Sequence, residues 1–452
     1  MRGDRPIAPI KSLSGPANNR YVCRRYGEKS VRTTGTFIWA APVLLAMAAT
    51  PSSAQTDERG VAVGERQRPG YEPYGYRLGS VTLYPSVGLT GDYSDNYRAT
   101  DSNRQSDFYL TVSPEVRLAS DWSRHRLTAQ AFFSQQIHAK LRGEDVSQYG
   151  ASVGGTYDVS RQTSFGFDLS ARHASESRSA LGSFRGTLEP VEYDTVQAAV
   201  SVSHNFNRLD LNGSAGAGYV NYGDIFGLTG LTIDQDFRDV RTVFLAGGAQ
   251  YDIGPGLGIV VSGRLDDSRY RFRPGRAGFD PLINIDRASS GYSLQAGLAF
   301  ELSSLVFGNV QVGVLDRNYD DPRLQDFNGL SFSGDILWNV TPLTSVRFRA
   351  ARTIEDTSST IVAGNTRSEF RVSVDHELYR YLILSGDAVY AHFSPNGVGV
   401  GGNEYSAGVR ARYLIDRRFS VTGGLRYSNR TSDSNFLRYN AFGATIGVNV
   451  AF

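Results

Sequence analysis

The sequence predicts an all-β fold, a transmembrane antiparallel up-and-down β-barrel of about 18 strands with short periplasmic turns and long extracellular loops. Three observations predict it. Apolar residues alternate with small or polar ones along most of the chain, the connections alternate between short and long, and aromatic residues gather at both ends of the segments. A soluble β-sandwich would share the alternation, but it has no reason to sort its connections by length.

The N-terminus carries the one long apolar run, residues 37–48. Basic residues precede this run and a Ser-Ser-Ala sequence follows it, which is the pattern of a secretory signal peptide. The run is too short for a membrane anchor and is interrupted by Pro42. We therefore expect residues 1–54 to be a signal peptide that is cleaved after Ala54. Its basic region is unusually long, which is consistent with a true start near Val31.

Removal of this leader would change the charge of the chain. The leader holds eight of the 47 Lys and Arg residues and two of the 45 Asp and Glu residues, so the formal net charge would fall from +2 to −4. An acidic mature chain argues against nucleic acid as a partner. The single cysteine, Cys23, would also leave with the leader, so we expect neither disulfides nor thiol chemistry.

Residues 55–76 are polar and rich in Gly, Pro and Arg, and we expect them to form a short periplasmic N-terminal arm. The barrel then spans residues 77–452. In its first strand, Pro85 indicates a position near the rim, where a missing backbone donor matters less. The outward positions of that strand are apolar: Val81, Leu83, Val87, Leu89 and Tyr93.

The same two-residue period recurs to the end of the chain. Each segment has roughly ten residues, the length that a tilted membrane-spanning strand needs. Examples are residues 108–118, 149–157, 196–202, 257–266 and 369–375.

The connections between these segments differ in length in a regular way. Short turns on one side and long loops on the other are typical of outer-membrane barrels, and an even strand number places both termini on the short-turn side. The short connections are 120–125, 160–163, 205–208, 254–256, 301–304, 341–344, 379–381 and 416–418, and the long ones include 97–105, 175–192, 222–239, 271–287, 316–327, 354–366 and 394–403.

Outward-facing aromatic residues cluster at both strand ends, and we interpret them as belts at the two water–lipid interfaces. Aromatic residues are common in any strand, so the sorting rather than any single ring supports this interpretation. The ring set beside the short turns is Tyr157, Phe165, Tyr251, Phe300, Trp338, Tyr413, Phe419 and Phe452, and the set toward the long loops is Tyr93, Phe108, Phe133, Tyr149, Tyr219, Tyr292, Phe370, Tyr390, Tyr405 and Tyr427.

The chain ends on an alternating strand with an aromatic last residue. Such an ending is typical of the closing strand of an outer-membrane barrel, although an edge strand of a soluble sandwich also fits. We therefore expect the lipid of the outer membrane and the outer-membrane assembly machinery as partners. The apolar positions of this strand include Phe442, Ile446, Val448, Val450 and Phe452.

Charged residues gather at inward positions of the late strands. A barrel of this size is wide enough for an aqueous lumen, and a charged wall would select solutes by charge. Guanidinium groups could also bind the carboxylates of an acidic sugar polymer. Alternatively, Arg–carboxylate pairs between strands only stiffen the wall. The candidate residues are Arg347, Arg349, Arg371, Arg410, Arg412, Arg426, Glu369, Asp375 and Asp387.

We expect no enzymatic activity, no cofactor and no catalytic residue. The six histidines have no nucleophile motif beside them, and residues 329–334 are not followed by a helix as a nucleophile elbow would be. The GxGxxG pattern at 397–402 lies between strands, and we interpret it as a loop tip rather than a dinucleotide-binding site. Oxygen ligands crowd the loop at 316–326 and could bind a hard cation, but a solvated acidic loop is the simpler interpretation.

The start of the predicted barrel also resembles a known family. Arg68-Pro-Gly-Tyr-Glu-Pro-Tyr-Gly-Tyr-Arg-Leu-Gly-Ser80, Leu83-Tyr-Pro85 and Asp92-Tyr-Ser-Asp-Asn-Tyr97 are similar to the opening of type 2 outer-membrane β-barrel porins, and residues 113–125 to their first short turn. The resemblance implies a location in the outer membrane of a Gram-negative cell and a part in exopolysaccharide secretion, with polysaccharide and export components as partners. A general porin for small polar solutes, or a structural barrel plugged by loops such as 271–287, remains open.

Overall fold

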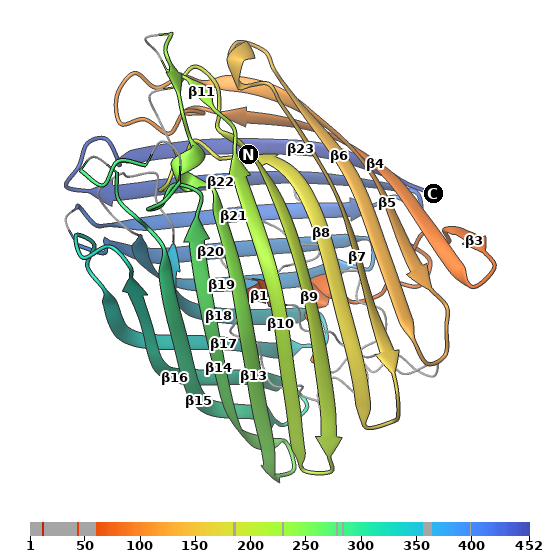
Figure 1. Ribbon diagram of the computed structural model, residues 1–452. Coiled ribbons are helices and arrows are strands. Elements are labelled where there is room, and N and C mark those ends of the chain that lie inside the picture. The colour runs from red at the N-terminus through yellow and green to blue at the C-terminus, as the bar shows by residue number, and fades with distance from the viewer. Residues whose placement is uncertain are drawn as a thin grey trace.

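The computed structural model describes residues 11–12, 43–44 and 60–452, except 184–186, 228–229, 277–278, 283, 356–363 and 398. Eighteen antiparallel strands of 12 to 15 residues close into one barrel (Figure 1). The predicted fold class and strand number are therefore confirmed. Most of the predicted signal peptide lies outside the described residues. Its described positions, Lys11–Ser12 and Val43–Leu44, form a separate pair of two-residue strands.

Each strand of the barrel pairs with its sequence neighbour, as in a meander. Three one-turn 3-10 helices, η1 (Val63–Glu65), η2 (Arg142–Glu144) and η3 (Asp236–Arg238), lie in the arm and the loops. The strands are β1 (Lys11–Ser12), β2 (Val43–Leu44), β3 (Tyr76–Leu78), β4 (Val81–Ser94), β5 (Asp107–Ser120), β6 (Arg126–His138), β7 (Val146–Asp158), β8 (Thr163–Ser175), β9 (Glu192–Phe206), β10 (Leu209–Tyr222), β11 (Ile225–Phe226), β12 (Thr232–Ile233), β13 (Val240–Gly254), β14 (Leu257–Tyr270), β15 (Ser289–Leu302), β16 (Val306–Tyr319), β17 (Phe327–Thr341), β18 (Thr344–Glu355), β19 (Asn365–Tyr379), β20 (Leu382–Pro395), β21 (Gly402–Leu414), β22 (Phe419–Ser432) and β23 (Tyr439–Ala451).

The last strand closes the barrel by pairing with the first. β23 pairs with β4 from Gly443 opposite Ser94 to Ala451 opposite Ser86, and the backbone N–H of Phe452 donates to the Pro85 carbonyl at 3.0 Å. β3 pairs with the remaining length of β4, beyond the end of β23. The C-terminal strand therefore removes the edge that an open sheet would expose.

The two ends of the barrel differ as predicted. Short turns connect the strands at one end, where β4 begins and β23 ends (Figure 1). The long connections lie at the other end, and the one after β10 contains its own small hairpin, β11–β12. We call the first end periplasmic and the second extracellular.

The outer face carries the apolar residues of each strand. Ile446 is 64% exposed and Val409 is 61% exposed, as lipid-facing side chains would be. Seventeen of the eighteen rings predicted for the belts are exposed, and the exception, Phe300, is half-buried. Among the described residues, no helix is long and apolar enough to cross a membrane.

Candidate functional site: the barrel lumen

The inward positions of five neighbouring strands, β18 to β22, form what we call the arginine wall. Their charged residues number eight arginines and six carboxylates, a formal net charge of +2. All nine charged residues singled out from the sequence lie at these positions. The full set is Arg347, Arg349, Arg367, Arg371, Arg410, Arg412, Arg426 and Arg430 with Glu355, Glu369, Asp375, Glu377, Asp387 and Glu404.

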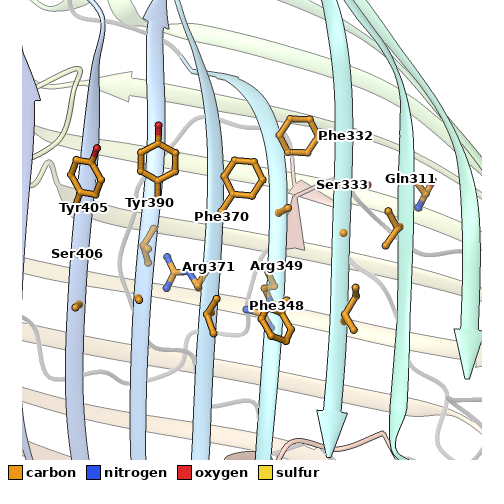
Figure 2. A pocket seen from close by; sticks show the side chains of 18 of the residues that line it. Gln311, Phe332, Ser333, Phe348, Arg349, Phe370, Arg371, Tyr390, Tyr405 and Ser406 are labelled. Atoms are coloured by element: carbon orange, nitrogen blue, oxygen red, sulfur yellow. The ribbon is translucent and has the colours of Figure 1, made fainter. Parts of the chain in front are cut away.

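Arg349 and Arg371 lie directly opposite each other on β18 and β19. Each has a carboxylate beside it. Arg349 is 3.5 Å from Asp335 of β17, and Arg371 is 3.2 Å from Glu369 of its own strand. The Arg349 side chain is 48% exposed, on the face opposite the lipid-facing ring of Phe348 (Figure 2). Like charges at directly opposed positions destabilise a sheet, so this pair is not explained by wall stiffening alone.

Arg426 reaches across a neighbouring strand to a carboxylate. It lies on β22, and its Nη2 is 2.6 Å from Asp387 Oδ1 on β20. The intervening position on β21 is Gly408, where a Cβ atom would lie 3.0 Å from Arg426 Nη2 and 3.2 Å from the Asp387 carboxylate. A side chain larger than hydrogen at position 408 would therefore obstruct this ion pair.

A second network, which the sequence reasoning missed, lies at the extracellular end of the same wall. Arg367 pairs with Glu404, and Glu404 accepts a 2.6 Å hydrogen bond from Nε of Arg430. Arg430 is 2% exposed and lies over the rings of Phe393 and Tyr439. Glu404 lies between the two arginines, so each buried charge in this network has an opposite charge beside it. A single buried arginine without such a carboxylate would be costly to bury.

The loop at 176–191 connects this network to the opposite side of the barrel. It leaves from β8 and returns to β9, and the carbonyl of its Ser179 accepts a hydrogen bond from Arg430 on β22. The base of this loop is fixed by Arg178, which forms two hydrogen bonds, of 2.8 and 2.9 Å, with Glu144. Glu144 is fully buried and also pairs with Arg98, so one carboxylate joins three extracellular loops.

The N-terminal arm lies at the periplasmic end of the arginine wall. Its turn η1 contacts inward positions of β18 and β19, and Val63 is fully buried there. Arg68 is 7% exposed and its Nη2 is 3.2 Å from Glu377, while burial of the guanidinium lowers the Arg68 pKa. The sequence predicted an arm in this region but not that it would enter the lumen.

The wall opposite the arginines is mostly uncharged. β7 to β10 lie across the 18-strand ring from β18 to β21. The inward positions of β9 between its ends are Thr195, Gln197, Ala199, Ser201, Ser203 and Asn205. The lumen therefore has one face rich in guanidinium and carboxylate groups and another on which hydroxyl and amide groups predominate, with Asp168, Arg172 and Asp210 as charged exceptions on β8 and β10.

The outer face of the same strands carries a hollow of about 720 Å³. Its lining includes small residues such as Gly334 and Ala388. A row of rings that includes Phe370, Tyr390 and Tyr405 borders it (Figure 2). Its lining is mostly apolar and its rings lie on the lipid side of the strands, so we do not assign it to the aqueous path.

Aspartates at two places in the extracellular loops differ in whether they have an arginine partner or other aspartates beside them. In the loop predicted to be acidic, Asp321 pairs with Arg323, which lowers the Asp321 pKa to about 2. A group that the sequence did not single out, Asp224, Asp234 and Asp236, has carboxylate oxygens within 4.8 Å of one another. These three side chains are the group that could hold a cation in the described part of the chain.

The closed barrel, with its apolar outer face and polar inner face, defines a class, the outer-membrane β-barrels. The chain belongs to the family described as "Putative beta-barrel porin 2", whose sequence profile matches residues 68–452. The protein is therefore located in the outer membrane, and the family resemblance noted in the sequence is confirmed. No curated protein sequence matches the chain.

Several solved structures share the general architecture. The copper transporter OprC is 11% identical, with a TM-score of 0.48 and coverage of 83% of this chain and 81% of its own. A BenF-like porin from Pseudomonas fluorescens Pf-5 is 13% identical, with a TM-score of 0.44 and coverage of 82% and 99%. A bacterial polysaccharide outer membrane secretin is 10% identical, with a TM-score of 0.35 and coverage of 81% and 98%. Such similarity does not identify what this barrel carries.

Proposed function

We propose that this protein is a channel for acidic sugar polymers that takes part in exopolysaccharide secretion, as the conduit or as an accessory barrel. The directly opposed pair Arg349 and Arg371 is the observation that supports a binding role most strongly. Because opposed like charges cost stability, a solute that bears carboxylates gives a reason for them to be there. The hydroxyl and amide groups of β9 could hydrogen-bond sugar hydroxyls on the other side.

The partners follow from this role. Outer-membrane lipid surrounds the apolar outer face, and the assembly machinery would act on the closing strand. Export components on the periplasmic side would deliver the polymer to the end where the arm lies.

A general diffusion porin for small polar solutes is the second candidate. The close pairs Arg347–Asp335 and Arg426–Asp387, at 2.5 and 2.6 Å, favour it, because paired charges create a transverse field without net attraction for anions. A structural barrel plugged by its loops is the third, and the contact between Ser179 and Arg430 favours it.

Deletion of the gene, followed by an assay of secreted polysaccharide, tests the first candidate. Loss of polymer from the medium, restored by the wild-type gene, is expected, whereas unchanged secretion contradicts the proposal. Neighbouring genes for glycosyltransferases or a polymerase would agree with it. Conductance in planar bilayers separates the other two, because a plugged barrel carries no steady current.

A further inference from the structure

The turn of the N-terminal arm is held by groups of the arginine wall. Val63 donates its backbone N–H to Ser345 Oγ at 2.8 Å, and Glu65 Oε1 is 3.4 Å from Arg347 Nη1. The carbonyl of Gly64 accepts a 3.4 Å hydrogen bond from Arg412 on β21. Strands β18 and β21 of the wall therefore contribute to one site at the periplasmic end, and β19 adds the carboxylate of Asp375.

Space at the second residue of the turn is very limited. A Cβ atom on Gly64 would lie 2.8 to 2.9 Å from the carboxylate of Asp375, whose oxygen accepts the Gly64 backbone N–H. The turn is therefore packed so closely against the wall that position 64 has no space for a side chain.

The arm offers the wall the same hydrogen-bonding roles as an acidic sugar, whose O–H groups would donate where the arm uses N–H groups. It presents a carboxylate to one arginine, a neutral oxygen to a second arginine, and N–H donors to a hydroxyl and to a carboxylate. The contacts to Arg347 and Arg412 are both 3.4 Å long, which is longer than the roughly 2.7–2.9 Å of a strong charge-assisted hydrogen bond. An external carboxylate with shorter contacts would compete with them.

We propose that the turn formed by residues 62–65 occupies an entrance site for carboxylate-bearing sugars, as an internal competitor that an incoming acidic oligosaccharide displaces. This inference rests on the proposed transport of acidic polymers and adds the location of the first binding site and its regulation. Displacement widens the periplasmic opening only when a ligand of the right charge is present. Arg347 keeps its pair with Asp335 throughout, so what the ligand replaces is the second carboxylate, that of Glu65. Neutral sugars have no carboxylate to replace it and leave the arm in place.

The first test uses the full chain in planar bilayers, with trigalacturonate as the acidic probe and maltotriose as the neutral one. The variant Glu65→Gln removes the competing carboxylate, so we expect the concentration of trigalacturonate that half-blocks the current to fall about 3- to 10-fold. Arg347→Gln should raise that concentration. Glu72→Gln is the matched control, because Glu72 accepts from the backbone of Arg68 within the arm.

The second test does not require current. The sequence contains one cysteine, so a Cys23→Ser background with Val63→Cys carries a single thiol at a fully buried position. Trigalacturonate should accelerate labelling of this thiol by a water-soluble maleimide several-fold, and maltotriose should not. Equal labelling with both sugars, or a Glu65→Gln channel with wild-type block, overturns the entrance site. A barrel that labels as expected but carries no current instead overturns the proposed channel.

Discussion

Reversal of the charge at the Arg349–Arg371 pair tests whether the arginine wall borders the ion path. The double variant Arg349→Glu, Arg371→Glu changes the formal charge of the wall from +2 to −2. One unit charge acts on an ion about 10 Å away with roughly 0.4 kcal/mol in water, and four units with about 1.7 kcal/mol. At 0.1 M salt, where the Debye length is also about 10 Å, screening leaves about 0.6 kcal/mol.

Cations and anions shift in opposite directions, so the ratio of their permeabilities should change by about 1.2 kcal/mol, or roughly eightfold. The measurement is the reversal potential across a tenfold KCl gradient in planar bilayers, which should move toward cation selectivity. The double variant Arg104→Glu, Arg276→Glu changes the same number of charges on exposed loops and should have little effect. An open, folded double variant with a wild-type reversal potential would refute the placement of the wall along the path.

Three other perturbations have distinct outcomes. Ile446→Arg places a charge on the lipid face and should destabilise the barrel by about 2–4 kcal/mol in denaturant unfolding from vesicles; a stability within error of wild type would contradict the assigned face. Glu144→Ala removes the carboxylate that pairs with the buried guanidinium of Arg178, which keeps its hydrogen bonds to Thr187, at a local cost of about 3–5 kcal/mol. Limited proteolysis should therefore cut the loop at 176–191 faster while the strands stay intact, and unchanged cleavage rates would show that Glu144 does not hold the loop. Arg323 lowers the Asp321 pKa from 3.8 to about 2, so the stabilisation from this pair is present above pH 3.8 and is lost as the pH falls through about 2. The backbone amides of residues 320–326 should therefore stay protected from hydrogen exchange at pH 3 in wild type but not in Asp321→Asn. Equal protection in both proteins would contradict the pairing.

The arginine wall contacts chain segments at both ends of the barrel. At the extracellular end, Arg430 holds the loop at 176–191, and at the periplasmic end Arg347 and Arg412 hold the turn of the arm. Both contacts use arginines of the same five strands. A solute that binds this wall therefore meets the elements that narrow the channel at either end.

The sequence by itself determined the barrel, because strand periodicity, turn chemistry and the faces of a strand are local properties. The alternation that ends at Phe442, Ile446 and Phe452 gives the closing strand and its lipid face without reference to any other part of the chain. The same parity placed Arg349 and Arg371 on the inward face.

Only the tertiary structure decided which of those inward groups meet. The contacts Arg430–Ser179 and Arg347–Glu65 join residues separated by more than 250 positions. They depend on how the 18 strands close and on where the arm and loops fold, and strand periodicity contains no information on either. The physical reason is that closure brings distant strands across a shared lumen, where any loop of sufficient length can reach them.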